Sequence, residues 1–272
     1  MSYHHAAFVG SIPENYDRYL GPLLFEPYAL DIVARLQASE NAAVLELACG
    51  TGIVTRKLRD TLPKNAKLVA TDLNEAMLEY ARGKFRADER IELKQADATD
   101  LPFEDSSFDA VVCQFGLMFF PDKAKALGEV RRVLIPGGVF FFNVWGAIEK
   151  NELPNISHHT VSSFFEGDPP TFYQVPFGLY DQDLVSGLLR EARFENIDIS
   201  VVDKPGISAS STDAARGLIQ GNPILAEIQE RATSEAAVVE AALAAAIAAQ
   251  CGDNPVRSKL QAIVYSARRP IE

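Results

Sequence analysis

In the first half of the chain, short hydrophobic runs alternate with amphipathic stretches. The runs predict strands at residues 44–47, 67–71, 91–95, 109–114 and 139–144. The stretches between them have helical spacing and predict helices at 53–60, 74–85 and 123–134, with a further pair of helices within 11–37. Asn74 is a candidate N-cap, and the PGG sequence at 136–138 ends the last of these helices. Strands alternating with helices in this way predict an α/β fold with a doubly wound, mostly parallel sheet.

The second half departs from this alternation after Trp145. Residues 147–180 are rich in proline and aromatic residues, and 206–258 are helical with an alanine-rich stretch. Between and after them we expect a helix at 181–192 and strands at 197–202 and 260–268. We therefore predict one domain over residues 1–272, with a cofactor-binding core at 40–146. The insertions at 147–180 and 206–258 would cap a substrate or mediate dimerisation.

Composition excludes some classes of function. The 272 residues carry 26 Lys and Arg against 37 Asp and Glu, a net charge of −11, which disfavours nucleic acid as a partner. No apolar run approaches the ~20 residues of a membrane span, and no secretory signal precedes the fold, so we expect a cytoplasmic protein. Cys49, Cys113 and Cys251 have no metal-site spacing, so no metal is predicted.

A glycine-containing turn follows the first predicted strand and offers a ligand site. Residues 46–52 read ELACGTG, and a strand that turns into a helix here presents backbone N–H groups and a positive dipole end. A dinucleotide fingerprint would have a third glycine where this chain has Thr55. Glu46 would repel a pyrophosphate but would attract a cationic cofactor without phosphates. An NAD-type oxidoreductase stays open as the alternative.

Polar or small residues end the next three strands as well. Asp72 follows the second strand, where a carboxylate can bind a ribose diol. Asp97 with Ala98 follows the third strand, and Gln114 with Phe115 follows the fourth. Since the carboxyl ends of parallel strands share one edge of the sheet, these residues predict a nucleoside-containing cofactor there.

Several further segments carry a family resemblance. Together with ELACGTG, residues 97–103 (DATDLPF), 107–109 (SFD), 121–122 (PD) and 131–138 (RRVLIPGG) resemble the motifs of class I S-adenosylmethionine-dependent methyltransferases. Within that class the chain most resembles the ubiquinone/menaquinone-biosynthesis type, over residues 14–146, 194–204 and 260–269. The resemblance implies a seven-stranded Rossmann-like sheet with an antiparallel last strand, N-terminal helices and helical cap insertions. It also implies S-adenosylmethionine as cofactor and S-adenosylhomocysteine as product.

The resemblance also assigns cofactor-binding residues. They are Tyr16, Glu46, Ala48, Gly50, Thr51, Gly52, Thr55, Asp72, Leu73, Met77, Asp97, Ala98, Gln114 and Phe115. Glu46 would face the methionyl ammonium, Asp72 the ribose hydroxyls, and Asp97 the adenine amino group. Gln114 would line the sulfonium side, and Tyr16 would either close over the cofactor or pack as a helix residue. Thr55 would contact the methionyl group or lie on the helix surface.

Methyl transfer from a sulfonium is an in-line displacement that depends mainly on alignment. A general base is needed only where the nucleophile keeps its proton, and His158 and His159 are candidates, with Tyr173 as an orienting group. The alternative for the histidines is a solvated or helix-capping pair. Aromatic residues in 147–180 suggest an apolar or aromatic small-molecule acceptor, bound by a monomer or homodimer. A non-catalytic module that binds S-adenosylmethionine is a further alternative.

Overall fold

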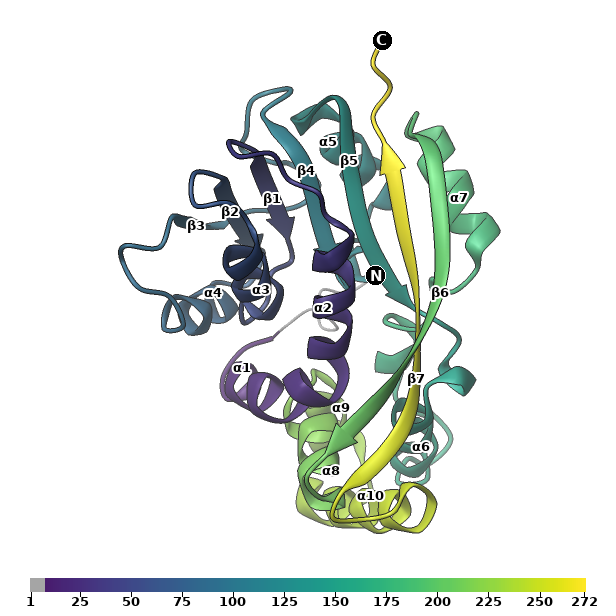
Figure 1. Ribbon diagram of the computed structural model, residues 1–272. Coiled ribbons are helices and arrows are strands. Elements are labelled where there is room, and N and C mark those ends of the chain that lie inside the picture. Colours follow the sequence, from purple (N-terminus) through teal and green to yellow (C-terminus); the bar gives the residue numbers. More distant parts are fainter. Residues whose placement is uncertain (1–7) are drawn as a thin grey trace.

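The computed structural model describes residues 8–272, which form a seven-stranded sheet of order β3-β2-β1-β4-β5-β7-β6 (Figure 1). The strands are β1 (Ala43–Leu47), β2 (Lys67–Asp72), β3 (Ile91–Gln95), β4 (Phe108–Gln114), β5 (Leu134–Trp145), β6 (Glu195–Ser208) and β7 (Val256–Arg268). The first five strands are parallel, and β7 runs antiparallel to both β5 and β6. This confirms the predicted mostly parallel sheet with an antiparallel last strand.

Helices cover both faces of the sheet because the buried strands are apolar on both sides. The helices are α2 (Glu26–Arg35), α3 (Ile53–Thr61), α4 (Glu75–Arg82), α5 (Lys123–Val133) and α7 (Gln182–Glu191). On one face, Val44 of β1 packs in a core with residues of α2 and α3. On the other face, the adjacent Leu45 belongs to the core that contains residues of α5 and α7. Glu46 shares the face of Val44 and therefore points toward α3.

The N-terminal segment forms three helical pieces where the sequence predicts two helices. α1 (Ile12–Asn15) continues into the π-helical segment η2 (Tyr16–Phe25) and then into α2. Pro22 lies inside η2 and has no N–H for a regular α-helical hydrogen bond, which is consistent with the wider turn. Leu20, Leu23 and Leu24 of η2 are buried in the main core.

The last two strands are longer than the predicted 197–202 and 260–268, and that prediction was wrong at their ends. β5 pairs with β7 only as far as Trp145 and Ala262, whereas β6 and β7 stay paired to Ser208 and Val256. The sequence KPG at 204–206 looks like a turn, yet it is extended strand. A side chain at Gly206 would lie 2.7 Å from the Ser258 hydroxyl, so glycine permits close strand contact here.

The projecting β6–β7 ribbon carries cap helices near the carboxyl ends of the parallel strands (Figure 1). These are α6 (Glu152–Ser162) from the first insertion and α8 (Ser211–Gln220), α9 (Ile224–Arg231) and α10 (Ala236–Cys251) from the second. Three short 3-10 turns accompany them: η3 (Leu117–Phe119), η4 (Ile148–Lys150) and η5 (Phe172–Gln174). Within residues 8–272, no helix has both the length and the apolar character needed to cross a membrane.

Candidate active site

The turn between β1 and α3 has the backbone conformation that its glycines allow. Gly50 and Gly52 have φ values of +55° and +82°, in the left-handed region that favours glycine. A Cβ at Gly52 would lie within 3.2–3.3 Å of Phe85 and Ala81, so any side chain would also crowd the neighbouring α4 region. Ala48 adopts a φ of 52° without being glycine, which marks a strained position at the end of β1.

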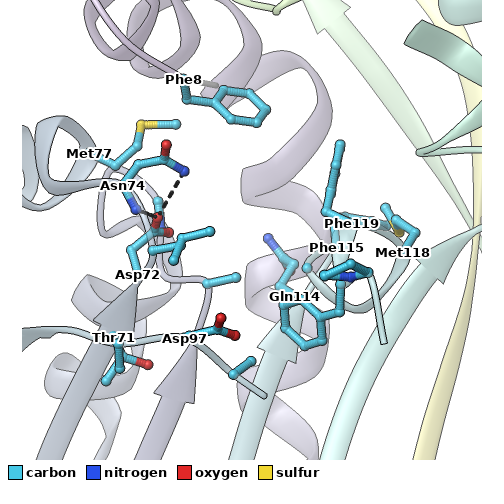
Figure 2. Close-up of a pocket in the computed structure, with 18 of the residues that line it drawn as sticks. Phe8, Thr71, Asp72, Asn74, Met77, Asp97, Gln114, Phe115, Met118 and Phe119 are labelled. Atoms are coloured by element: carbon cyan, nitrogen blue, oxygen red, sulfur yellow. Dashed lines mark hydrogen bonds between the residues drawn. The ribbon is translucent and has the colours of Figure 1, made fainter. Parts of the chain in front are cut away.

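Asp72 at the end of β2 connects two of the strand ends. Its Oδ2 accepts a hydrogen bond from the Gly50 N–H at 2.8 Å. Its Oδ1 accepts one from the Asn74 N–H, also at 2.8 Å (Figure 2). Burial raises the pKa of the Asp72 carboxyl, and these backbone donors partly oppose the rise. The carboxylate is therefore held in one orientation, with lone pairs left to accept hydrogen bonds from a diol.

A cavity opens where these strand ends meet, and we call it the cofactor cavity. Ten of the predicted residues line it: Tyr16, Ala48, Gly50, Asp72, Leu73, Met77, Asp97, Ala98, Gln114 and Phe115. Figure 2 shows Asp72 and Met77 on one side of this space and Gln114, Phe115 and Phe119 on the other. Asp97 is oriented by its Oδ1, which accepts hydrogen bonds from the backbone N–H and the hydroxyl of Thr99, both at 2.8 Å.

Four predicted residues lie behind the cavity wall and do not line it: Glu46, Thr51, Gly52 and Thr55. Glu46 is only 2% exposed, and its Oε2 has no hydrogen-bond partner among residues 8–272. Burial raises the pKa of the Glu46 carboxyl to about 8, Asp72 adds to this rise, and neighbouring Thr55 partly opposes it. Thr55 is fully buried on α3 and is therefore not the surface threonine of the alternative reading.

Sequence reasoning missed about half of the cavity lining. The missed residues are Phe8, Thr71, Asn74, Ala96, Gly116, Met118, Phe119, Phe120, Pro121, Lys123 and Val175. Apart from Phe8 and Val175, they lie at the end of a predicted strand or between it and the start of the next helix, so the loop sequences could have suggested them. Phe8 and Val175 are distant in sequence from every motif and carried no such signal. Lys123 donates to the carbonyls of Met118 and Phe120 at 3.2 and 3.0 Å and so supports the η3 turn.

A second, aromatic cavity adjoins the first, and we call it the acceptor cavity. The two cavities share five lining residues: Phe8, Tyr16, Phe115, Met118 and Phe119. The remaining lining residues of the acceptor cavity are Leu24, Phe25, Trp145, Pro154, Phe172, Tyr173, Pro176, Phe177, Leu218 and Asn222. They come from η2, β5 and both insertions, which are far apart in the sequence.

Phe115 forms part of the wall between the two cavities and is held in an unusual conformation. Its φ is 52°, which is costly for a bulky side chain. The ring stacks on Trp145 with centroids 3.8 Å apart, and the backbone N–H donates to Asn143 Oδ1 at 2.9 Å. Asn143 is fully buried, so this hydrogen bond fixes the direction in which Phe115 leaves β4.

The three predicted catalytic residues lie on the insertion side of the acceptor cavity. Tyr173 lines it and donates a hydrogen bond to the Ser157 hydroxyl at 2.8 Å, whereas neither histidine lines either cavity. The His158 ring lies 5.9 Å from the Tyr173 ring, and burial and His159 lower the pKa of His158. His159 is exposed. Of the three, Tyr173 lies at the acceptor cavity, His158 packs against it outside the cavity lining, and His159 faces solvent.

Comparison with known proteins identifies several similar sequences and folds. Residues 45–142 match the model of a methyltransferase domain family. The chain is 29% identical to the demethylmenaquinone methyltransferase of Staphylococcus epidermidis, over 69% of this chain and 83% of that protein. It is 33% identical to the ubiquinone/menaquinone biosynthesis C-methyltransferase UbiE of Proteus mirabilis, over 58% of this chain and 68% of that protein.

A solved structure extends the likeness to the whole fold. Phosphoethanolamine N-methyltransferase 2 of Haemonchus contortus, in complex with S-adenosyl-L-methionine, superposes with a TM-score of 0.62. The match covers 99% of this chain and 60% of that chain at 15% sequence identity, so it concerns the fold alone.

Proposed function

Because the chain belongs to the UbiE type of class I S-adenosylmethionine-dependent methyltransferases, we propose that its methyl acceptor is an apolar aromatic molecule of the quinol class. The family membership confirms the predicted enzyme class and cofactor, and it sets aside the oxidoreductase and the non-catalytic module. The predicted activity, methyl transfer from S-adenosylmethionine to a small-molecule acceptor, is the activity of this class. The acceptor cavity is the observation that carries the proposal.

The cofactor cavity has the chemistry that S-adenosylmethionine requires. The buried oxygens Glu46 Oε2 and Gln114 Oε1 both lack a hydrogen-bond partner among the described residues, and acidic side chains surround the cavity. Such groups favour a ligand that carries ammonium and sulfonium charges. Asp72 would accept the ribose hydroxyls and Asp97 the adenine amino group, while Leu73 and Met77 supply apolar contacts. Tyr16 lines the cavity, and its ring stacks on Phe25 with centroids 4.6 Å apart, so we infer that it would close over the cofactor.

Glu46 would act from behind the glycine turn. Its unpartnered oxygen points toward α3, so contact with the methionyl ammonium would run through a water or through a small movement of the Gly50–Gly52 turn. Thr51 and Gly52 would support this turn and not touch the cofactor. Thr55 does not line the cavity, so in place of the predicted methionyl contact it would orient the Glu46 carboxyl.

The acceptor cavity favours a flat apolar ring. Its lining is dominated by aromatic side chains, among them Trp145, Phe172 and Phe177. Offset or edge-to-face contacts of such rings with an aromatic ligand contribute about 0.5–1.5 kcal/mol each beyond their burial. The names of the similar proteins point the same way, since demethylmenaquinone carries an aromatic ring system.

The bound cofactor supplies an activated methyl group, and the protein's part is to align, shield and orient. Phe115 and Met118 lie at the junction of the cavities, where they would hold the acceptor in line with the sulfonium methyl and exclude water. Gln114 Nε2 donates a hydrogen bond to the Phe25 carbonyl at 3.1 Å, and this bond fixes the orientation of the Gln114 amide. The amide oxygen Oε1 has no partner among the described residues and would orient the methyl group of the cofactor.

Proton removal from the acceptor has few candidates among the described lining residues. Burial strongly raises the pKa of the Tyr173 phenol, so Tyr173 stays protonated at neutral pH and can orient an acceptor but not deprotonate it. His158 could act only from behind Tyr173. A quinol suits such a cavity, because its hydroxyl oxygens donate electron density into the ring and make a ring carbon nucleophilic while the hydroxyl stays protonated. The proton lost from that carbon after methyl transfer is strongly acidic and needs no strong base.

The proposal is tested by methyl-transfer assays with a reduced 2-prenyl-1,4-naphthoquinol and with phosphoethanolamine as the charged acceptor. We expect S-adenosylhomocysteine to form with the quinol and not with phosphoethanolamine; the reverse preference would contradict the proposal.

Phe177→Ala should raise the KM of the quinol without changing the affinity for S-adenosylhomocysteine. Phe194→Ala is the matched control, because Phe194 is equally buried but packs near Phe140, outside both cavities.

A further inference from the structure

Asp17 connects the N-terminal segment to the cofactor-binding turn, although it lines neither cavity. Its Oδ1 accepts a hydrogen bond from the Thr51 hydroxyl at 2.7 Å and one from the Lys84 ammonium group. Its Oδ2 accepts a hydrogen bond from the Tyr80 hydroxyl at 3.3 Å. One carboxylate thus joins the N-terminal segment to two other parts of the chain, which lie 34 to 67 residues away from Asp17 in the sequence.

Each of these parts contains or adjoins a residue that lines the cofactor cavity. Thr51 lies in the glycine turn, between Gly50 and Gly52. Tyr80 belongs to α4, which also carries Met77 of the cavity wall, and Lys84 lies in the turn that follows α4. Asp17 itself is the neighbour of Tyr16, which lines both cavities.

We propose that Asp17 is a positioning residue that holds the start of η2, and with it Tyr16, closed over the cofactor, and so slows cofactor release. The inference rests on the proposed cofactor role of this cavity. The Asp17 and Lys84 side chains are only 19% and 26% exposed, so solvent screens their attraction less than that of a surface pair. Hydrogen bonds that involve an ionised partner are also stronger than neutral ones.

The rest of η2 is attached independently of Asp17. Leu20 and Leu23 have no exposed surface, and Leu24 is 5% exposed. Loss of the Asp17 contacts should therefore release the first turn of η2 without unfolding the segment. Arg18 is exposed beside Asp17, so tryptic cleavage after Arg18 reports on this release.

The experiment compares S-adenosylhomocysteine binding by wild type, Asp17→Ala, Asp17→Asn and Lys84→Met. No methyl acceptor is present, so an error in the acceptor proposal cannot affect the result. We expect Asp17→Ala to raise the dissociation rate about tenfold or more, as loss of a charged hydrogen bond would. Asp17→Asn and Lys84→Met should give smaller increases, because each removes the ion pair but leaves the Thr51 contact. In wild type the ligand should protect against cleavage after Arg18, and in Asp17→Ala it should not.

Asp60→Ala is the matched control, since it removes an ion-paired carboxylate (2.7 Å from Arg56) at the far end of α3. Thermal unfolding of each ligand-free variant separates a general loss of stability from a faster release. Dissociation rates for Asp17→Ala and Asp17→Asn within twofold of the control would overturn the inference. If wild type itself does not bind S-adenosylhomocysteine, the cofactor assignment of the cavity fails first. Should Asp17→Ala not fold, Asp17→Asn and Lys84→Met decide the question.

Discussion

Replacing Glu46 by glutamine should change how the stability of the ligand-free protein depends on pH. Burial raises the pKa of this carboxyl from its ordinary 4.5 to about 8. Between these two pH values the unfolded chain has lost the Glu46 proton while the folded chain still holds it, so folding takes up a proton. The folded state therefore loses stability as pH rises through this window.

The size of the effect follows from the two pKa values. Keeping Glu46 protonated in the folded state costs about 1 kcal/mol at pH 5 and about 3 kcal/mol at pH 7. Glutamine has a similar shape and no proton to lose. The stability of Glu46→Gln relative to wild type should therefore increase by roughly 2–3 kcal/mol between pH 5 and pH 7.

Urea unfolding at several pH values, followed by circular dichroism, measures this difference directly. Glu92→Gln removes an exposed carboxylate from β3 and controls for the change in net charge. Parallel stability curves for Glu46→Gln and wild type between pH 5 and 8 would refute the reasoning, because they would mean that Glu46 is ionised in its buried position. The same carboxyl should release a proton when S-adenosylmethionine binds at pH 6.5, which calorimetry in two buffers of different ionisation enthalpy detects.

Other substitutions test the remaining parts of the site. Asp72→Ala should weaken S-adenosylmethionine binding at least about tenfold in a calorimetric titration, since it would remove the proposed ribose contact and the Gly50 hydrogen bond; unchanged affinity would exclude the ribose role. Gly52→Val should lower both thermal stability and cofactor affinity, because φ is +82° and the new side chain would meet Phe85; a variant with normal melting and binding would contradict the turn geometry. His159→Ala should leave turnover unchanged, and His158→Ala should slow turnover more than it weakens binding if this imidazole acts behind Tyr173; equal rates for both variants and wild type would make the pair structural.

The strand-end residues show why much of the cofactor cavity could be predicted. Gly50, Asp72, Asp97 and Gln114 each lie at the end of a hydrophobic run or within three residues after it. Parallel strands place such positions at one edge of the sheet whatever the details of packing. The same reasoning could not tell that Glu46 lies behind the turn. That depends on strand alternation, which directs Glu46 and Val44 to the face covered by α3.

The acceptor cavity could not be assembled from the sequence. Aromatic residues in the insertions suggested an apolar site, but Trp145 of β5, Phe25 of η2 and Leu218 of α8 meet there only after the chain has folded. Likewise, the KPG sequence at 204–206 has the composition of a turn, and only pairing with β7 keeps it extended. The turn propensity of these residues contributes less free energy than a continuous ladder of hydrogen bonds between paired strands.

The sequence by itself determined the sheet, the glycine turn and the strand-end polar residues, because each depends on local periodicity and on where a strand ends. Only the tertiary structure decided that Asp17 joins Thr51 and Lys84, that Phe115 separates two cavities, and that His159 lies in solvent. These features arise from contacts between residues far apart in the chain. Their geometry is fixed by the packing of several elements at once, which no local pattern encodes.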